Sequence, residues 1–360
     1  MDAQTARTDR VDLVLKGGGV KGVAMAGTLA ALEEAGVESV RVAGASAGAI
    51  AGALHAAGYT AAELRSILAG LDFEQFLDRA WEDKIPLIGR GVSVLLDLGI
   101  YEGHVFERWL AELLADKDVE TFGDLPAVDP DDRFDHRFQV IVSDVSARRL
   151  LVLPRDAALL GIDPDELNVA RAVRMSMSIP IFFEPVRVEN PETGVEHVLV
   201  DGGMLSNFPV WLFDTDGPPR WPTLGLMLVD GSPGDPIIER LPGLDLTGGP
   251  INRTTAYVKA LVSTMMEAHD RLHLDDADFV RTIPIPNLGV ATTQFDLDRP
   301  TADALYDAGL GAGRSFLETW DFGAYVAEFR SGTDQPGRTL RLATQLETCL
   351  LYTSDAADEF

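Results

Sequence analysis

A serine in a glycine-flanked turn constrains the fold of this chain more than any other feature. The run GASAG at residues 44–48 follows a short β-prone segment and precedes an alanine-rich segment with helical spacing. Serine on a sharp strand-to-helix bend requires glycine two positions away on either side, because a Cβ atom at Gly44 or Gly48 would meet neighbouring backbone. The run predicts a strand–turn–helix unit that presents Ser46 as a nucleophile, although such turns also occur for purely structural reasons.

A glycine-rich loop lies upstream of this turn. It connects a strand-like segment at 11–16 to a segment with helical spacing at 20–36. The loop contains Gly17, Gly18, Gly19, Lys21 and Gly22. Loops of this kind present backbone N–H groups at the positive end of a helix, which suits a phosphate group or the oxyanion of a tetrahedral acyl-transfer intermediate. Glycine is expected where main chain closely approaches a reacting carbonyl group.

The same loop also matches the glycine spacing of dinucleotide-binding sites. An NAD or FAD site requires an acidic residue about twenty positions further on, at the end of the second strand, to bind the ribose. Here the second strand leads into the Ser46 turn, although Glu38 lies just before it. A Walker phosphate loop would need a Lys-Ser or Lys-Thr pair after its last glycine, where this chain has Val23 and Ala24. The sequence therefore favours the acyl-transfer interpretation.

Asp201 is the third candidate site residue. It ends a strand-like segment at 196–200 and precedes Gly202 and Gly203, which permit a tight turn. A serine hydroxyl is a weak nucleophile until a base removes its proton. Asp201 is placed to act as that base if its turn meets the turn of Ser46.

Histidine is the usual base in serine hydrolases, and this chain has six. The nine residues from Ser46 to His55 correspond to a helical rise of about 13–14 Å. His197 lies four residues before Asp201 on the same strand, about 13 Å away. The others, at neither a strand end nor a glycine turn, are His104, His136, His269 and His273. The sequence therefore favours a Ser46–Asp201 dyad over a triad with histidine.

The three motifs, in this order, resemble those of the patatin-like phospholipase family. The resemblance extends to residues 172–180, ahead of the aspartate, and to residues 207–209, just after it. It covers about residues 10–325. Ile181 departs from the small residue that is usual after Pro180, which would reshape the acyl pocket without removing a catalytic group.

This resemblance implies a fold, an activity and site roles. The fold would be a three-layer α/β fold with a central, mostly parallel sheet. The activity would be hydrolysis of carboxylic esters of lipids, including phospholipids, through an acyl-enzyme and with no metal or other cofactor. Ser46 would be the nucleophile and Asp201 the general base. The amides of Gly17, Gly18 and Gly19 would form the oxyanion hole.

Two other functions stay open at this point. One is a phospholipase effector that is inactive until a nucleotide or a partner activates it, which the resemblance permits. The other is a non-catalytic lipid-binding relative. The second is the weaker alternative, because every catalytic position of the motifs is filled.

Strand-like and helix-like segments alternate along the chain, which is typical of an α/β fold with a largely parallel sheet. Strands are expected at 11–16, 40–43, 137–143, 149–153, 181–188, 196–200, 223–229 and 278–284, and helices at 20–36, 47–57, 60–79, 102–115, 165–177, 253–273 and 301–319. No linker rich in Gly, Ser or Pro divides the chain. We therefore expect one acyl hydrolase domain at 11–325, an N-terminal tail at 1–10 and a C-terminal extension at 326–348.

The net charge of −27 argues against a nucleic-acid partner, since no dense basic patch is present to neutralise phosphates. The same charge restricts contact with an anionic bilayer to a local apolar or arginine-lined face. Residues 42–62 carry no charge, but they are mostly Ala and Gly and include the Ser46 turn, so a membrane span is not predicted. No apolar leader precedes the first strand, and we expect a cytoplasmic protein with peripheral membrane contact.

The single cysteine, Cys349, argues against a disulfide framework and against a cysteine-based metal site. Residues 349–359 resemble the conceptual translation of a transposon adapter used in preparing sequencing libraries. We therefore expect the authentic sequence to diverge near residue 348, and we treat residues 349–360 as a non-native tail.

Overall fold

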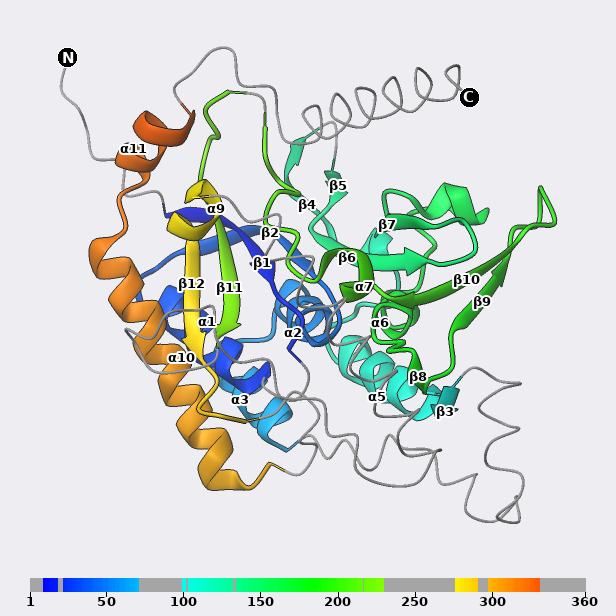
Figure 1. The fold of residues 1–360 in the computed structure, drawn as a ribbon, viewed down its shortest axis with the longest axis horizontal. Coiled ribbons are helices and arrows are strands. Elements are labelled where there is room, and N and C mark those ends of the chain that lie inside the picture. The colour runs from blue at the N-terminus through cyan, green and yellow to red at the C-terminus, as the bar shows by residue number, and fades with distance from the viewer. Residues whose placement is uncertain are drawn as a thin grey trace, which may run out of the picture.

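A mixed β-sheet with a parallel centre organises the structure (Figure 1). The structure is a computed structural model that describes residues 9–18, 22–70, 99–101, 103–131, 134–215, 217–229, 276–290 and 297–330. The eight strands of the main sheet are β1 (Arg10–Leu15), β2 (Glu38–Gly44), β6 (Phe138–Asp144), β7 (Arg149–Leu153), β9 (Val186–Glu189), β10 (Glu196–Asp201), β11 (Thr223–Val229) and β12 (Thr282–Pro286). Two short pairs are separate, β3 (Gly99–Tyr101) with β8 (Ile181–Phe183) and β4 (Pro126–Asp131) with β5 (Phe134–His136).

The strand order brings two distant chain segments to one edge of β6. The order is β12-β11-β1-β2-β6-β10-β9, in which neighbours from β12 to β6 are parallel and β10 and β9 are antiparallel additions. β7 pairs with β6 over residues 140–144, so β2 and β10 share the other edge of β6. Gly44 lies opposite Val140 and Asp201 lies opposite Val142. β2 and β10 therefore run toward each other, and their ends meet about two residues apart.

A buried ion pair between β1 and β2 supports one particular alignment of these two strands. Asp12 pairs with Arg41 across the two strands, and the same register places Leu15 beside Gly44. The guanidinium of Arg41 donates to both carboxylate oxygens of Asp12, at 2.9 and 2.7 Å. Three aromatic rings surround it, those of Phe134, Phe213 and Trp221. A bidentate, desolvated pair of this kind disfavours a one-residue slip, because a slip would leave both charges buried and unpaired.

Helices cover one face of the sheet. The longer ones are α1 (Gly22–Glu34), α2 (Ala47–Ala56), α3 (Ala61–Ala69), α5 (His104–Ala115), α6 (Val169–Ser176) and α10 (Arg299–Thr319). Short helical segments are η4 (Phe122–Asp124), η5 (Ala157–Leu160), α7 (Gly203–Ser206), α9 (Asp276–Val280), α11 (Phe322–Tyr325) and η6 (Val326–Arg330). α10 packs along α1 and β12 at one side of the sheet (Figure 1).

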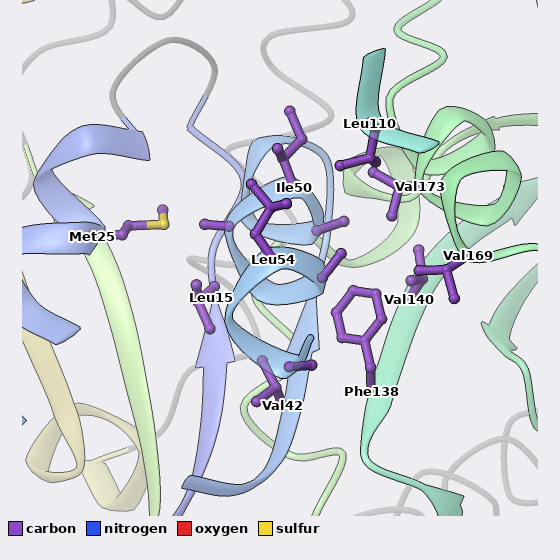
Figure 2. Close-up of a cluster of buried hydrophobic side chains, with 14 of the residues drawn as sticks. Leu15, Met25, Val42, Ile50, Leu54, Leu110, Phe138, Val140, Val169 and Val173 are labelled. Carbon is purple, nitrogen blue, oxygen red and sulfur yellow. The ribbon is translucent and has the colours of Figure 1, made fainter. Parts of the chain in front are cut away.

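Hydrophobic clusters lie on both faces of the sheet, because successive side chains of a strand point in opposite directions. Leu15 and Val42 belong to the larger cluster, where they pack with residues of the helices, including Ile50 and Leu54 of α2 (Figure 2). A smaller cluster contains Val14, Ala43, Ile141, Val152, Phe208, Val210, Leu212, Phe213 and Met227. Residues 208–213 and Phe134 thus cover the second face in the described part of the chain. The central strands are mostly apolar because both of their faces are buried, and the charges of Asp12 and Arg41 are buried there as a pair.

The structure confirms most of the predicted elements and corrects three. The helix predicted at 60–79 ends at Ala69, with Gly70 as its C-cap. The strand predicted at 278–284 begins at Thr282, because Asp278 belongs to the short helix α9 and is bound by the side chains of Arg281 and Thr282. The strand predicted at 181–188 is two strands, β8 and β9, with the carbonyl group of Glu184 accepting a hydrogen bond from Arg174 between them. The helix predicted at 253–273 and the expected tail at 349–360 lie outside the described residues.

Among the described helices, none has the length and apolar character needed to cross a bilayer. The uncharged stretch at 42–62 contributes the end of β2, the Ser46 turn, the ten-residue helix α2 and the start of α3. Its small residues pack in the protein interior, as the sequence predicts.

Candidate active site

Ser46 lies on a strained turn between β2 and α2. Its backbone has φ 52° and ψ −127°, a conformation that residues other than glycine rarely adopt. A Cβ atom at Gly44 would lie 2.4 Å from the carbonyl oxygen of Gly48, and one at Gly48 would lie 2.2 Å from that of Leu15. These contacts confirm the predicted reason for both glycines. Backbone strain of this type costs about 1–3 kcal/mol and requires support from the surrounding structure.

The glycine-rich loop lies directly beside Ser46. A Cβ atom at Gly17 would lie 3.1 Å from the Cβ of Ser46 and 2.0 Å from Oδ1 of Asn207. The N–H of Gly17 donates to the carbonyl oxygen of Asn207 at 3.1 Å, and the Asn207 amide donates back to the Gly17 carbonyl at 3.4 Å. Gly17 therefore does not have a free amide for an oxyanion, which corrects its predicted role. Gly18 is described and half-buried, whereas Gly19 and Lys21 lie outside the described residues.

Asp201 ends β10 and is completely buried. Its Oδ1 accepts a hydrogen bond from the N–H of Gly203 at 2.7 Å, and its Oδ2 has no hydrogen-bond partner. Burial raises the pKa of Asp201 to about 7, although the Gly203 amide and the hydroxyl of Ser46 both lower it. Strand pairing brings this carboxyl group toward the Ser46 turn, since Gly44 and Asp201 lie opposite Val140 and Val142 of β6.

Neighbouring backbone explains why glycine follows Asp201. A Cβ atom at Gly202 would lie 2.1 Å from the carbonyl oxygen of Ile141 in β6. Gly203 supplies the N–H that binds the aspartate, and it begins α7. The N–H of Asp201 itself donates to the carbonyl oxygen of Ser178 at 2.9 Å. The turn therefore lies tightly against β6 on one side and the end of α6 on the other.

Comparison with known proteins identifies the family. The family model of patatin-like phospholipases matches residues 13–214, a range that includes Ser46 and Asp201. The chain belongs to the patatin-like phospholipase family. YqhO of Bacillus subtilis, an uncharacterised protein, is 38% identical over 312 residues, which are 87% of this chain and 99% of YqhO. Human patatin-like phospholipase domain-containing protein 6 is 28% identical over 212 residues, which are 58% of this chain but only 12% of that protein.

A solved structure supports the patatin-like fold. The crystal structure of VipD from Legionella pneumophila matches with a TM-score of 0.50 and 18% sequence identity, over 86% of this chain and 67% of VipD. At this identity the similarity concerns the fold alone. Together with the sheet described above, it confirms the predicted α/β fold with a central, largely parallel sheet.

Three histidines of this patatin-like chain, His55, which is half-buried, and the buried His136 and His197, bind partners other than Ser46 and Asp201. His55 pairs with Ser39 at 2.8 Å, His136 with Asp165 at 2.6 Å and His197 with Asp144 at 2.8 Å. His104 is exposed, and His269 and His273 lie outside the described residues. Burial lowers the pKa of His55 to about 4, which keeps its ring neutral at pH 7. Among the described histidines, none is hydrogen-bonded to Ser46 or Asp201.

Ser176, at the end of α6, is the site residue that the sequence did not single out. Its Oγ accepts the N–H of Ser46 at 2.9 Å and donates to the carbonyl oxygen of Ile141 at 2.7 Å. The sequence signal was the family-like block at 172–180, which gives no indication of which hydroxyl contacts the Ser46 turn. In the described ranges, no group of three His, Cys, Asp or Glu side chains is arranged to hold a metal ion.

Proposed function

We propose that this chain is a lipid acyl hydrolase that cleaves carboxylic esters of lipids, including phospholipids, with Ser46 as nucleophile and Asp201 as general base. Membership of the patatin-like phospholipase family supports the substrate class. The observation that carries the mechanism is that β2 and β10 end about two residues apart on one edge of β6, which brings the Ser46 turn to the buried carboxyl group of Asp201.

The environment of Asp201 suits a general base. A carboxylate with an ordinary pKa near 4 is a poor acceptor for the proton of an alcohol. Burial raises the pKa of Asp201 to about 7, so its carboxylate is a stronger base that is still ionised above neutral pH. Its Oδ2 has no hydrogen-bond partner and so has lone pairs available for the serine proton.

The reaction follows in two halves. Asp201 takes the proton of the Ser46 hydroxyl while Oγ attacks the ester carbonyl carbon. The tetrahedral oxyanion accepts hydrogen bonds from the N–H of Gly18 and, as the loop sequence predicts, from the N–H of Gly19. The carbonyl then re-forms, and the lipid alcohol leaves with the proton from Asp201. In the second half, Asp201 takes a proton from water, the resulting hydroxide attacks the acyl-enzyme, and Ser46 recovers its proton as the fatty acid departs.

The test is hydrolysis by the purified chain and by two variants. The wild type is incubated with p-nitrophenyl butyrate and with phosphatidylcholine vesicles, and released fatty acid and lysolipid are identified by mass spectrometry. Ser46→Ala and Asp201→Asn should each abolish hydrolysis while keeping a cooperative thermal transition. Full activity in either folded variant would exclude the dyad. Activity that appears only after addition of cell extract would favour the activated effector instead.

A further inference from the structure

The end of α6 contacts both turns of the proposed catalytic site. Oγ of Ser176 accepts the N–H of Ser46, and the carbonyl oxygen of Ser178 accepts the N–H of Asp201, each at 2.9 Å. We propose that Ser176 is a positioning residue, whose hydroxyl holds the backbone of Ser46 at the angle that points Oγ toward Asp201. This inference rests on the proposed function of Ser46 and Asp201.

The direction of the Ser176 hydroxyl is determined by its second partner. The hydroxyl donates its proton to the carbonyl oxygen of Ile141 at 2.7 Å, so a lone pair faces the N–H of Ser46. The same Ile141 carbonyl lies against Gly202, where a Cβ atom would be 2.1 Å away. The Ile141 carbonyl group of β6 therefore contacts both turns. It accepts the hydroxyl of Ser176, which binds the Ser46 turn, and it packs directly against Gly202 in the Asp201 turn.

Burial makes this hydrogen bond difficult to replace. Ser176 has no exposed surface and Ser46 is 2% exposed, so water does not readily reach either group. Without the hydroxyl, the N–H of Ser46 and the carbonyl group of Ile141 would each lose a partner. The peptide before Ser46 would then rotate toward another acceptor. Since Ser46 has a strained φ of 52°, rotation would also relieve strain and move Oγ away from its present direction.

The expected effect is on the chemical step. Misplacement of a reacting atom by about 1 Å can reduce the rate on the order of a hundredfold. Ser176→Ala should therefore lower kcat for p-nitrophenyl butyrate by about 10–100-fold. KM should change little, because the hydroxyl of Ser176 is bonded to protein and not aimed at a substrate position. Covalent labelling of Ser46 by a fluorophosphonate probe should slow by the same factor.

Ser39→Ala is the matched control. Ser39 is also buried, and its hydroxyl pairs with His55, so the substitution removes a partly buried hydrogen bond of a serine hydroxyl. It lies at the opposite end of β2, roughly 16 Å from Gly44 along the strand. Both variants should lose thermal stability, but only Ser176→Ala should lose kcat. Ser176→Thr retains the hydroxyl and should recover most of the labelling rate.

The outcomes separate this inference from the proposed function. If Ser46→Ala is inactive and Ser176→Ala keeps kcat within about twofold of wild type, the positioning role is wrong and the dyad stands. Equal losses of kcat in Ser39→Ala and Ser176→Ala would also overturn it, because the effect would then be general destabilisation. If Ser46→Ala hydrolyses esters normally, the proposed function itself fails. Should Ser176→Ala not fold, Ser176→Cys, with a weaker hydrogen-bonding thiol, should give an intermediate rate, and wild-type kcat in that variant would contradict the inference.

Discussion

The turn that carries Ser46 and the turn that carries Asp201 are built in opposite ways. The Ser46 turn follows a parallel strand, holds a non-glycine residue at positive φ and has its backbone N–H bound by Ser176. The Asp201 turn ends an antiparallel strand, and its carboxyl group is fully buried with Oδ2 unpaired. Backbone geometry thus prepares the proposed nucleophile, and desolvation prepares the proposed base. One site therefore combines two separate sources of local instability, a strained backbone at Ser46 and a desolvated carboxyl group at Asp201.

The largest expected effect is a loss of stability when a side chain is added at a glycine that packs closely against backbone, a contact found in both turns. Gly48→Ala and Gly202→Ala should each destabilise the protein by about 3 kcal/mol or abolish folding, because the new Cβ would meet a carbonyl oxygen that cannot rotate away. Gly311→Ala is the matched control, since nothing lies within 4 Å of its Cβ position and it belongs to helix α10. It should be neutral or stabilising in urea denaturation. Wild-type stability in Gly48→Ala would show that the turn has more room than the structure indicates.

The next effect concerns the aspartate turn alone. Burial raises the pKa of Asp201 in the folded protein to about 7. The contribution of its protonated carboxyl group to the free energy of unfolding is therefore fully present below the pKa of the unfolded chain, near 4, and is lost as pH rises through about 7. Asp201→Asn mimics the protonated form. It should be nearly neutral at pH 4 and more stable than wild type at pH 8, on the order of 3–4 kcal/mol. Urea denaturation at both pH values measures this difference.

Asp144→Asn provides a control of opposite sign for that measurement. Asp144 is also buried, and this burial alone would raise its pKa. Hydrogen bonds from Ser146 and His197 lower the pKa by more than burial raises it, so the pKa of Asp144 lies below its ordinary value. Its stabilising contribution is therefore present above the unfolded pKa and lost as pH falls through the folded pKa. Asp144→Asn should destabilise the protein at pH 8. Stabilisation by both substitutions at pH 8 would contradict the assigned role of Asp201 burial.

A smaller effect is expected in the pH dependence of activity. Asp201 must be ionised to accept the Ser46 proton, so kcat/KM should fall about tenfold for each pH unit below its pKa. The acid limb should show an apparent pKa of about 7. Fluorophosphonate labelling of Ser46 should follow the same curve, because it requires the same proton transfer. A flat profile between pH 5 and 8 would show that a group other than Asp201 is the base.

The smallest effect concerns strain in the serine turn. Ser46→Gly removes the nucleophile and also the cost of a side chain at φ 52°, so activity should be lost while the free energy of unfolding rises by about 1 kcal/mol. Ser46→Ala keeps the Cβ atom and should lose activity without this gain. Equal stability of the two variants would show that the turn is not strained.

Much of the nucleophile turn was predictable from the chain itself. Gly44, Ser46 and Gly48 lie within five residues, and the steric reason for the glycines is local, so the pattern indicated the correct bend. Asp201 was identified only as a carboxylate at a strand end. That β10 runs antiparallel and shares an edge of β6 with β2 depends on pairing between segments about 60 and 155 residues away from Asp201, which no local pattern contains.

The hydrogen-bond partners of the two turns also could not be predicted from local sequence patterns. The sequence assigned the Gly17 amide to an oxyanion, but the structure places it against the Asn207 carbonyl, and only the register between distant segments determines such a choice. Ser176 and Ser178 look equivalent in sequence, yet only the hydroxyl of Ser176 reaches the nucleophile turn.

By itself, the amino-acid sequence determined which residues are able to form tight turns and which short segments are apolar enough to become buried strands and helices. It did so because steric limits at glycine and the periodicity of burial act over a few residues. The tertiary structure alone decided that the Asp201 turn lies beside the Ser46 turn, which amides are already hydrogen-bonded and which serine hydroxyl binds the backbone of Ser46. Those outcomes depend on strand order and on desolvation, and both arise from contacts between residues far apart in the chain.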